Sequence, residues 1–264
     1  AATGIPNYYG LQRFGVVRPI THIVGGEILK GDYEAAVVAY IGRAFPLETE
    51  AAQAARRHFA ETRDARAALA ALPVQMTYER AMANHLIANP GDYAGTLRAL
   101  PPKLLSLLVS AFQSYLFNRA LSRRIDAGMT LTEPEAGDRL LFQDGREDIV
   151  TARNMKAAEV HIRRGRCRIA LFIPGSGAVT AHGRMDEIMQ ELMQEAGIDA
   201  GDFERASRFV DMRFDGVSRP ITLSTDVQAE VMDESVRLAF ALPPGHYATT
   251  VCREYMKADP YVMI

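Results

Sequence analysis

Apolar residues recur at helical spacing through the first half of the chain. One or two helices are predicted at 18–42, with Pro19 in a first turn and Asp32 as an N-cap. An alanine-rich stretch at 48–89 predicts more helices, broken near Pro73. The longest predicted helix covers 101–125. Its apolar stripe consists of Leu104, Leu105, Leu108, Phe112, Tyr115 and Leu116. The first half of the chain is therefore expected to be a helical unit.

The pattern changes at Gly128. "GDRLLFQDG" and "CRIALFIPGSG" predict short strands that end in glycine-rich turns. One helix is predicted between them at "ARNMKAAEVHIRRG", and another follows at "RMDEIMQELMQEAG". This middle region is thus expected to be a small mixed unit.

From Arg208 the period becomes two. Three strands are predicted within 208–216, 218–231 and 234–242, and their short connections favour an antiparallel meander. A final helix is predicted at 246–257. A three-stranded sheet leaves edges that need partners, and the candidates are the opening loop of this chain and a piece of protein outside it.

Composition excludes several classes of protein. The 264 residues are 48% hydrophobic and 23% charged, which is typical of a soluble globular chain. The two cysteines, Cys167 and Cys252, form no CxxC, and the six histidines are scattered, so neither a disulfide framework nor a metal site is predicted and a reducing cytoplasm is expected. The longest apolar run is too short to span a bilayer. Neither "GGEILKG" nor "PGSG" has the frame of a phosphate-binding loop; we interpret them as turns of a helix and of a strand, with no cofactor expected.

Arginine dominates the basic residues, with 26 arginines against four lysines and a net charge of −2. The planar guanidinium suits phosphates and bases, so the bias is compatible with RNA binding, although a GC-rich genome is the favoured explanation of the bias taken alone. The arginines cluster in "NRALSRR" and "RRGRCR".

The opening stretch "GIPNYYGLQRFG" crowds aromatic, amide and guanidinium side chains between two glycines. Aromatic faces stack on bases, amides bond base edges and guanidinium groups bind phosphate, which is the chemistry of single-stranded RNA recognition. The alternative is an aromatic-anchored terminal loop tucked onto the core. Residue types alone favour neither interpretation.

Several motifs, in order, resemble the TruD family of tRNA pseudouridine synthases. They are "GIPNYYGLQRFG", "SAFQSYLFNRALSRR", "GD" before a strand, "PGSG" and "LPPGHYATTVCREYMK", and NYYG has the form of the archaeal and eukaryotic branch. The resemblance implies a cofactor-free isomerase that converts a uridine of tRNA, with uridine 13 as the family expectation, to pseudouridine. In that family an aspartate attacks the nucleotide, the glycosidic bond breaks, and the uracil turns and rejoins through carbon 5.

The family's nucleophilic aspartate lies upstream of NYYG in a Gly-x-Lys-Asp context, and none of the aspartates of this chain has that context. We therefore expect that an N-terminal segment with the nucleophile is missing and that the chain alone is inactive. The start at Ala1 without methionine agrees with truncation, although methionine removal explains it too.

The resemblance assigns roles residue by residue. Tyr9 matches the aromatic position that lies against the target base, where the bacterial branch has Phe, and Asn7 matches the asparagine near the nucleophile. RNA contact or loop support is expected from Gln12, Arg13 and Phe14.

Three further arginines are candidate RNA-binding residues. Arg253 matches the arginine of the closing motif, where it would pair with a pocket carboxylate; a surface bridge to Glu254 or Glu230 is the alternative. Arg123 and Arg124 are candidates for tracking the RNA backbone, with a solvated helix end as the alternative.

The resulting expectation is an α+β fold. Residues 1–43 and 207–264 would be two returning parts of a pseudouridine-synthase catalytic domain, with an antiparallel sheet flanked by helices and incomplete at its N-terminus. Residues 44–206 would be an inserted, largely helical TRUD domain. A cytoplasmic monomer that acts on tRNA, without membrane or metal, is expected; a non-catalytic RNA-binding module and a helical protein-interaction scaffold are the alternatives.

Overall fold

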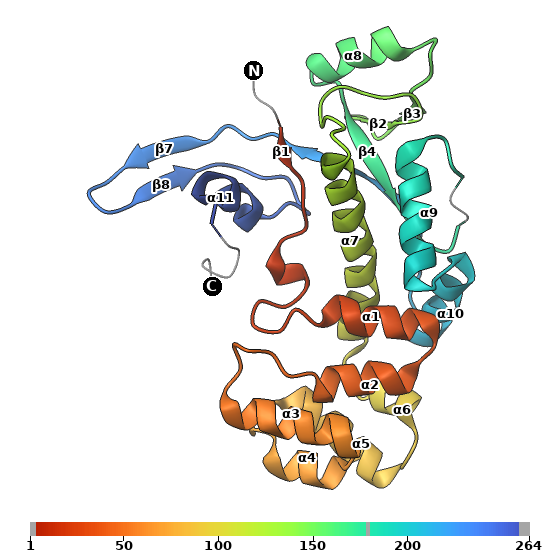
Figure 1. The fold of residues 1–264 in the computed structure, drawn as a ribbon, viewed down its shortest axis with the longest axis vertical. Coiled ribbons are helices and arrows are strands. Elements are labelled where there is room, and N and C mark those ends of the chain that lie inside the picture. Colours follow the sequence, from red (N-terminus) through yellow and green to blue (C-terminus); the bar gives the residue numbers. More distant parts are fainter. Residues whose placement is uncertain (1–3, 178–179, 259–264) are drawn as a thin grey trace.

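The computed structural model describes residues 4–177 and 180–258. It is an α+β fold in which helices dominate and the strands form small antiparallel sheets (Figure 1). None of the helices in these two ranges is long and apolar enough to cross a membrane.

Helix α7 (Pro102–Asp126) runs through the centre of the molecule and confirms the longest predicted helix (Figure 1). Helix α1 (Thr21–Lys30) crosses it closely because Gly25 and Gly26 present no side chain there. A Cβ on Gly25 would lie 2.0 Å from the carbonyl oxygen of Leu108 on α7. The glycine pair therefore lies inside a helix, within the segment 18–42 predicted to hold one or two, and it permits a close crossing.

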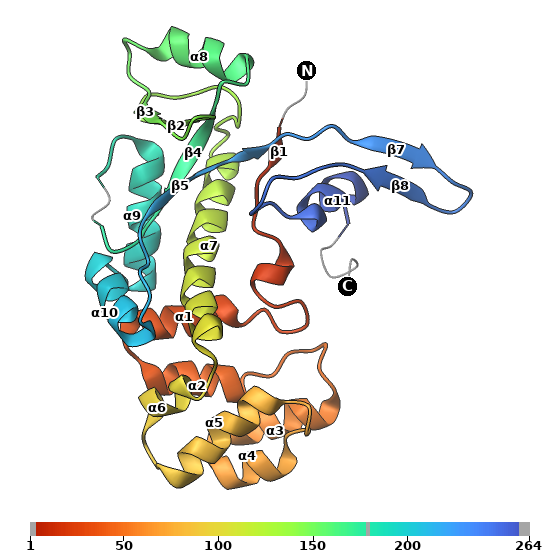
Figure 2. The same ribbon diagram turned by 180° about the vertical axis from the view of Figure 1, so that it is seen from behind.

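A helical lobe lies below this crossing, as the views from both sides show (Figures 1 and 2). Asp32 caps its first helix as predicted, since its side chain accepts a hydrogen bond from the N–H of Ala35. The lobe consists of α2 (Tyr33–Gly42), α3 (Glu50–Thr62), α4 (Ala65–Ala71), α5 (Thr77–Ala88) and α6 (Tyr93–Arg98).

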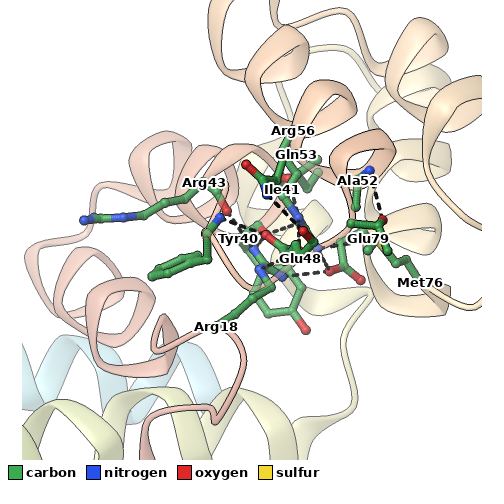
Figure 3. Close-up of polar contacts among 12 residues, drawn as sticks. Arg18, Tyr40, Ile41, Arg43, Glu48, Ala52, Gln53, Arg56, Met76 and Glu79 are labelled. Carbon is green, nitrogen blue, oxygen red and sulfur yellow. Dashed lines mark hydrogen bonds and ion pairs between the residues drawn. The ribbon is translucent and has the colours of Figure 1, made fainter. Parts of the chain in front are cut away.

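A buried network of two arginines and two glutamates joins this lobe to the opening loop (Figure 3). Arg56, whose side chain is 1% exposed, donates to Glu48 at 2.7 Å and to Glu79 at 2.8 Å. Arg18, which follows the opening loop, donates to the same Glu79 oxygen at 2.9 Å. Because each buried charge has an opposite partner, the network is neutral and fixes the end of the loop to the lobe.

A four-stranded antiparallel sheet has the order β3-β2-β4-β5. Its strands β2 and β4 and the neighbouring helices α8 and α9 confirm the predicted middle elements. The bounds are β2 (Arg139–Phe142), β3 (Glu147–Ile149), α8 (Met155–Arg163), β4 (Cys167–Ile173), α9 (Arg184–Ala196) and β5 (Val217–Pro220).

The predicted strand at 208–216 is wrong, because helix α10 (Ala200–Val210) occupies its first residues. Asp199 and Asp202 form a capping box at the start of this helix, and Phe203, Ala206 and Val210 bury one helical face. The apparent period of two at its end was therefore the tail of a helical period.

The predicted meander is also wrong in its pairing. Only β7 (Gln228–Val231) and β8 (Val236–Ala239) pair with each other, whereas β5 pairs with β4 and β6 (Thr222–Leu223) pairs with β1 (Ile5–Pro6). The opening segment thus supplies the partner of a C-terminal strand, one of the two candidates considered from the sequence. Helix α11 (Ala248–Met256) confirms the final predicted helix.

The predicted domain boundaries at residues 43 and 206 stay predictions. The β4–β5 pairing and the α1–α7 crossing both join segments on opposite sides of these boundaries. The two predicted domains are therefore packed continuously against each other in this structure.

Candidate active site

Asn7 fastens the opening loop to β5. Its backbone N–H donates to Ile221 O at 2.8 Å, its Nδ2 donates to Pro220 O at 2.8 Å, and its Oδ1 accepts from Arg219 Nη2 at 3.0 Å. The residue is 1% exposed. With both ends of its amide engaged, Asn7 orients the loop and Arg219. Its predicted role beside the nucleophile stays a prediction.

Tyr9 is held by α7 on one side and by the C-terminal segment on the other. Its backbone N–H and C=O both bond the side-chain amide of Asn118, at 2.9 and 3.0 Å. Its ring meets Phe117 and Tyr247 edge-on, with centroids 5.6 and 5.9 Å away. These contacts fix the ring before any ligand arrives.

Gly10 allows the loop to approach the start of α11. A Cβ at this position would lie 2.7 Å from Thr249 Oγ1 and 3.1 Å from Tyr247 Cδ1. A side chain on the glycine of NYYG would therefore have to displace its neighbours in the second quoted motif.

Arg219 lies against the ring of Tyr9 and was missed by the sequence interpretation. Its Cζ is 4.0 Å from the Tyr9 ring centroid, and its Nη1 donates to Gly245 O at 3.0 Å. Burial lowers the pKa of this guanidinium, while Tyr9 and Tyr247 act in the opposite direction. Arg219 thus ties β5, the opening loop and the segment before α11 together.

No sequence signal pointed to Arg219, because only the β4–β5 register and the fold of the loop bring it to Tyr9. Tyr247 was also missed as a site residue, although it stands inside the quoted motif "LPPGHYATTVCREYMK". An aromatic residue in a motif shared with a nucleic-acid enzyme is a signal that could have found it.

A cavity of about 180 Å³ opens between the loop, α7 and α11. Four of the predicted site residues line it together, namely Tyr9, Gln12, Phe14 and Arg253. Gln12 Oε1 accepts a hydrogen bond from Thr249 Oγ1 at 3.0 Å, which joins the two motifs again. The full lining is Tyr8, Tyr9, Gly10, Leu11, Gln12, Phe14, Val16, Asn118, Thr249, Thr250 and Arg253.

Two predicted arginines stay close to these aromatic rings. Arg13 donates from Nε to Ser114 Oγ at 2.9 Å, and its Cζ lies 5.9 Å from the centroid of Tyr9. Arg253 is exposed, with its Cζ 6.0 Å from the Tyr8 ring. Among the ion pairs of the described ranges, none involves Arg253, so neither the predicted carboxylate partner nor the alternative surface bridge is seen.

Arg123 and Arg124 do not join the site. The guanidinium of Arg124 is fully buried and forms a bidentate pair with Asp138, at 2.7 and 2.8 Å, so its burial argues against the predicted RNA contact. Arg123 bonds Glu191 and Glu195 on α9, which leaves its charge compensated. The dense arginine group on α7 is explained by packing of the long helix against its neighbours.

The site combines aromatic rings, an oriented amide and two guanidinium groups. The described residues contain no group of three His, Cys, Asp or Glu side chains that could hold a metal ion. In the same ranges no carboxylate forms an ion pair with Arg13 or Arg219. The arrangement can bind an aromatic base and an anion, but it contains no evident nucleophile.

Comparisons with known proteins give the context of this site. A family model described as tRNA pseudouridine synthase D (TruD) matches residues 1–255. A protein of Methanosarcina acetivorans named "Probable tRNA pseudouridine synthase D" is 38% identical over 274 residues, covering 98% of this chain and 62% of its own length. One of the same name from Halobacterium salinarum is 37% identical, covering 98% of this chain and 61% of its own length.

A solved structure is also similar. The crystal structure of a TruD protein from Methanosarcina mazei superposes with a TM-score of 0.88 at 38% identity, over 98% of this chain and 62% of the other. The chain therefore spans about three-fifths of the length of the relatives it matches.

Proposed function

The chain belongs to the TruD family of tRNA pseudouridine synthases, and we propose that it forms the base-binding side of an active site that isomerises a uridine of tRNA to pseudouridine. Uridine 13 is the position that the family resemblance suggests. Under this proposal tRNA is the partner, the cytoplasm is the compartment and the protein works as a monomer, which sedimentation velocity would test.

The observation that carries the proposal is the fixed position of Tyr9. Extracting a base from an RNA stack costs a few kcal/mol, and stacking on an aromatic side chain returns about 1 to 3 kcal/mol per base. The backbone of Tyr9 is held by Asn118 and its ring packs against Phe117 and Tyr247, so the ring loses little further freedom when a base lies on it. The conformational entropy of the Tyr9 side chain is therefore lost on folding and not on binding of the base.

The reaction breaks the bond between N1 of uracil and C1′ of the ribose, and forms a bond between C5 and C1′. The hydrogen on C5 leaves as a proton, and N1 gains one. We propose that the nucleophilic aspartate of the family comes from outside these 264 residues, from the part of the relatives that this chain does not span. None of the aspartates of this chain stands in the family's Gly-x-Lys-Asp context, which supports a nucleophile from outside it.

The proposal is tested with tRNA that carries tritium on C5 of its uridines. We expect the 264-residue chain to bind this tRNA without releasing tritium, and to release it when joined to the unmatched part of the Methanosarcina mazei relative. Binding with no release by the joined protein would favour a non-catalytic RNA-binding module. Release by the chain alone would show that the nucleophile lies within it.

A further inference from the structure

Two guanidinium groups approach the ring of Tyr9 from different segments. The Cζ of Arg219 on β5 lies 4.0 Å from the ring centroid, and the Cζ of Arg13, at the end of the 3₁₀ turn Leu11–Arg13, lies 5.9 Å from it. Two cations beside one ring repel each other, and the charge of Arg13 adds to burial in lowering the pKa of Arg219. Such an arrangement is costly unless an anion completes it.

Both groups keep donors that nothing in the described ranges uses. Arg219 donates from Nη1 to Gly245 O and from Nη2 to Asn7 Oδ1, while its buried Nε has no hydrogen-bond partner in the described ranges. Arg13 donates from Nε to Ser114 Oγ. A buried donor without an acceptor costs about 1 to 3 kcal/mol, which applies to Arg219 Nε. Arg13 is half-buried, and no hydrogen bond from its Nη groups is seen in the described ranges.

We propose that Arg13 and Arg219 together bind a phosphodiester of the RNA next to the nucleotide that lies on Tyr9. This site rests on the proposed function and gives the RNA backbone a defined contact there. Neither the family model nor the named relatives specify such a contact.

The chemistry favours a phosphodiester over a carboxylate. A phosphodiester spreads one negative charge over two non-bridging oxygens, so each guanidinium has an oxygen to bond. The rings of Tyr9 and Tyr247 lie beside the cations, and single-stranded RNA sites combine backbone cations with stacking platforms in this way. A carboxylate would use the cations but leave the aromatic surface unexplained.

The test measures binding of unmodified tRNA by the 264-residue chain at a series of KCl concentrations. Arg13→Gln/Arg219→Gln should flatten the plot of log K against log salt by about 0.7 to 0.9, which is the loss of one phosphate contact. Arg66→Gln, which removes an exposed cation on α4 in the helical lobe, is the matched control and should leave the slope unchanged. Arg219→Lys should keep most of the slope because it keeps the charge.

A second measurement identifies the anion and does not depend on how well the variants fold. The ¹⁵N–¹H signal of Arg219 Nε in the unaltered chain should shift on addition of the dinucleotide UpU, and far less with uridine or acetate. Acetate shifting the signal while UpU does not would overturn the proposal, because the site would then take a carboxylate. A double variant that folds and keeps the parental salt slope would overturn it as well.

These outcomes are separate from those of the proposed reaction, since both measurements report binding alone. A phosphate contact at Arg13 and Arg219 with no tritium release from the joined protein would refute the proposed isomerase activity and support the proposed RNA contact.

Discussion

Removing Asp138 should cost this fold far more than removing an exposed acid. The side chains of Arg124 and Asp138 are 0% and 3% exposed, and two parallel N–H···O bonds of 2.7 and 2.8 Å join them. Asp138→Ala leaves the Arg124 guanidinium buried, and among the described residues the Thr130 carbonyl is the one hydrogen-bond partner that remains. Breaking a buried pair from one side costs about 3 to 5 kcal/mol, because the remaining charge is uncompensated.

The assay is urea unfolding at 25 °C, with the free energy compared at equal m-value. Asp144→Ala is the control, because it removes an ion pair of similar length, 2.8 Å to Arg146. The side chains of Asp144 and Arg146 are 55% and 72% exposed, so this loss should be far smaller than that of Asp138→Ala. Equal losses for the two variants would refute the reasoning that burial of Arg124 sets its role. The result would then reopen Arg124 as a surface residue.

Two other predictions follow from packing and from burial. Gly25→Ala should destabilise the fold by at least about 1 to 3 kcal/mol in urea unfolding, although alanine usually stabilises a helix interior, because the new Cβ would lie 2.0 Å from a backbone atom of α7. A stabilised variant would show that α1 and α7 do not cross there. Burial lowers the pKa of His22 from 6.5 to about 4. Between pH 6.5 and pH 4 the unfolded chain therefore binds more protons than the folded one, and the free energy of unfolding should fall by about 2 to 3 kcal/mol as the pH drops through this range. His22→Phe should remove that part of the pH dependence, and an unchanged slope in this variant would assign the loss to other groups.

The helices were the part of the fold that the sequence predicted well. The stripe of α7 and the N-cap at Asp32 are local signals, and local signals need no knowledge of the rest of the chain. Strand pairing is a long-range property, and the sequence could not show that β5 would pair back to β4 and β6 to β1. The helix α10 was misinterpreted because its last residues mimic a strand period.

The site was predictable where a motif carried it. Tyr9, Gln12, Phe14 and Arg253 come from the two quoted end motifs, and the structure gathers them around one cavity. Arg219 lies outside the quoted motifs, and only three-dimensional packing reveals it.

For Arg124 the sequence suggested an exposed RNA-binding residue, whereas the structure shows a buried one. A charged pair at a helix end usually faces solvent, but here one of its members turns inward to meet a buried aspartate.

The most direct test of the central claim is tritium release from C5-labelled tRNA by the chain joined to the unmatched part of its Methanosarcina mazei relative, with Tyr9 varied. We predict that Tyr9→Phe keeps release, because the aromatic face remains, and that Tyr9→Ala abolishes it in a protein that still folds. Release that persists in a folded Tyr9→Ala protein would contradict the account, since the ring that meets Phe117 and Tyr247 would then have no part in holding the base.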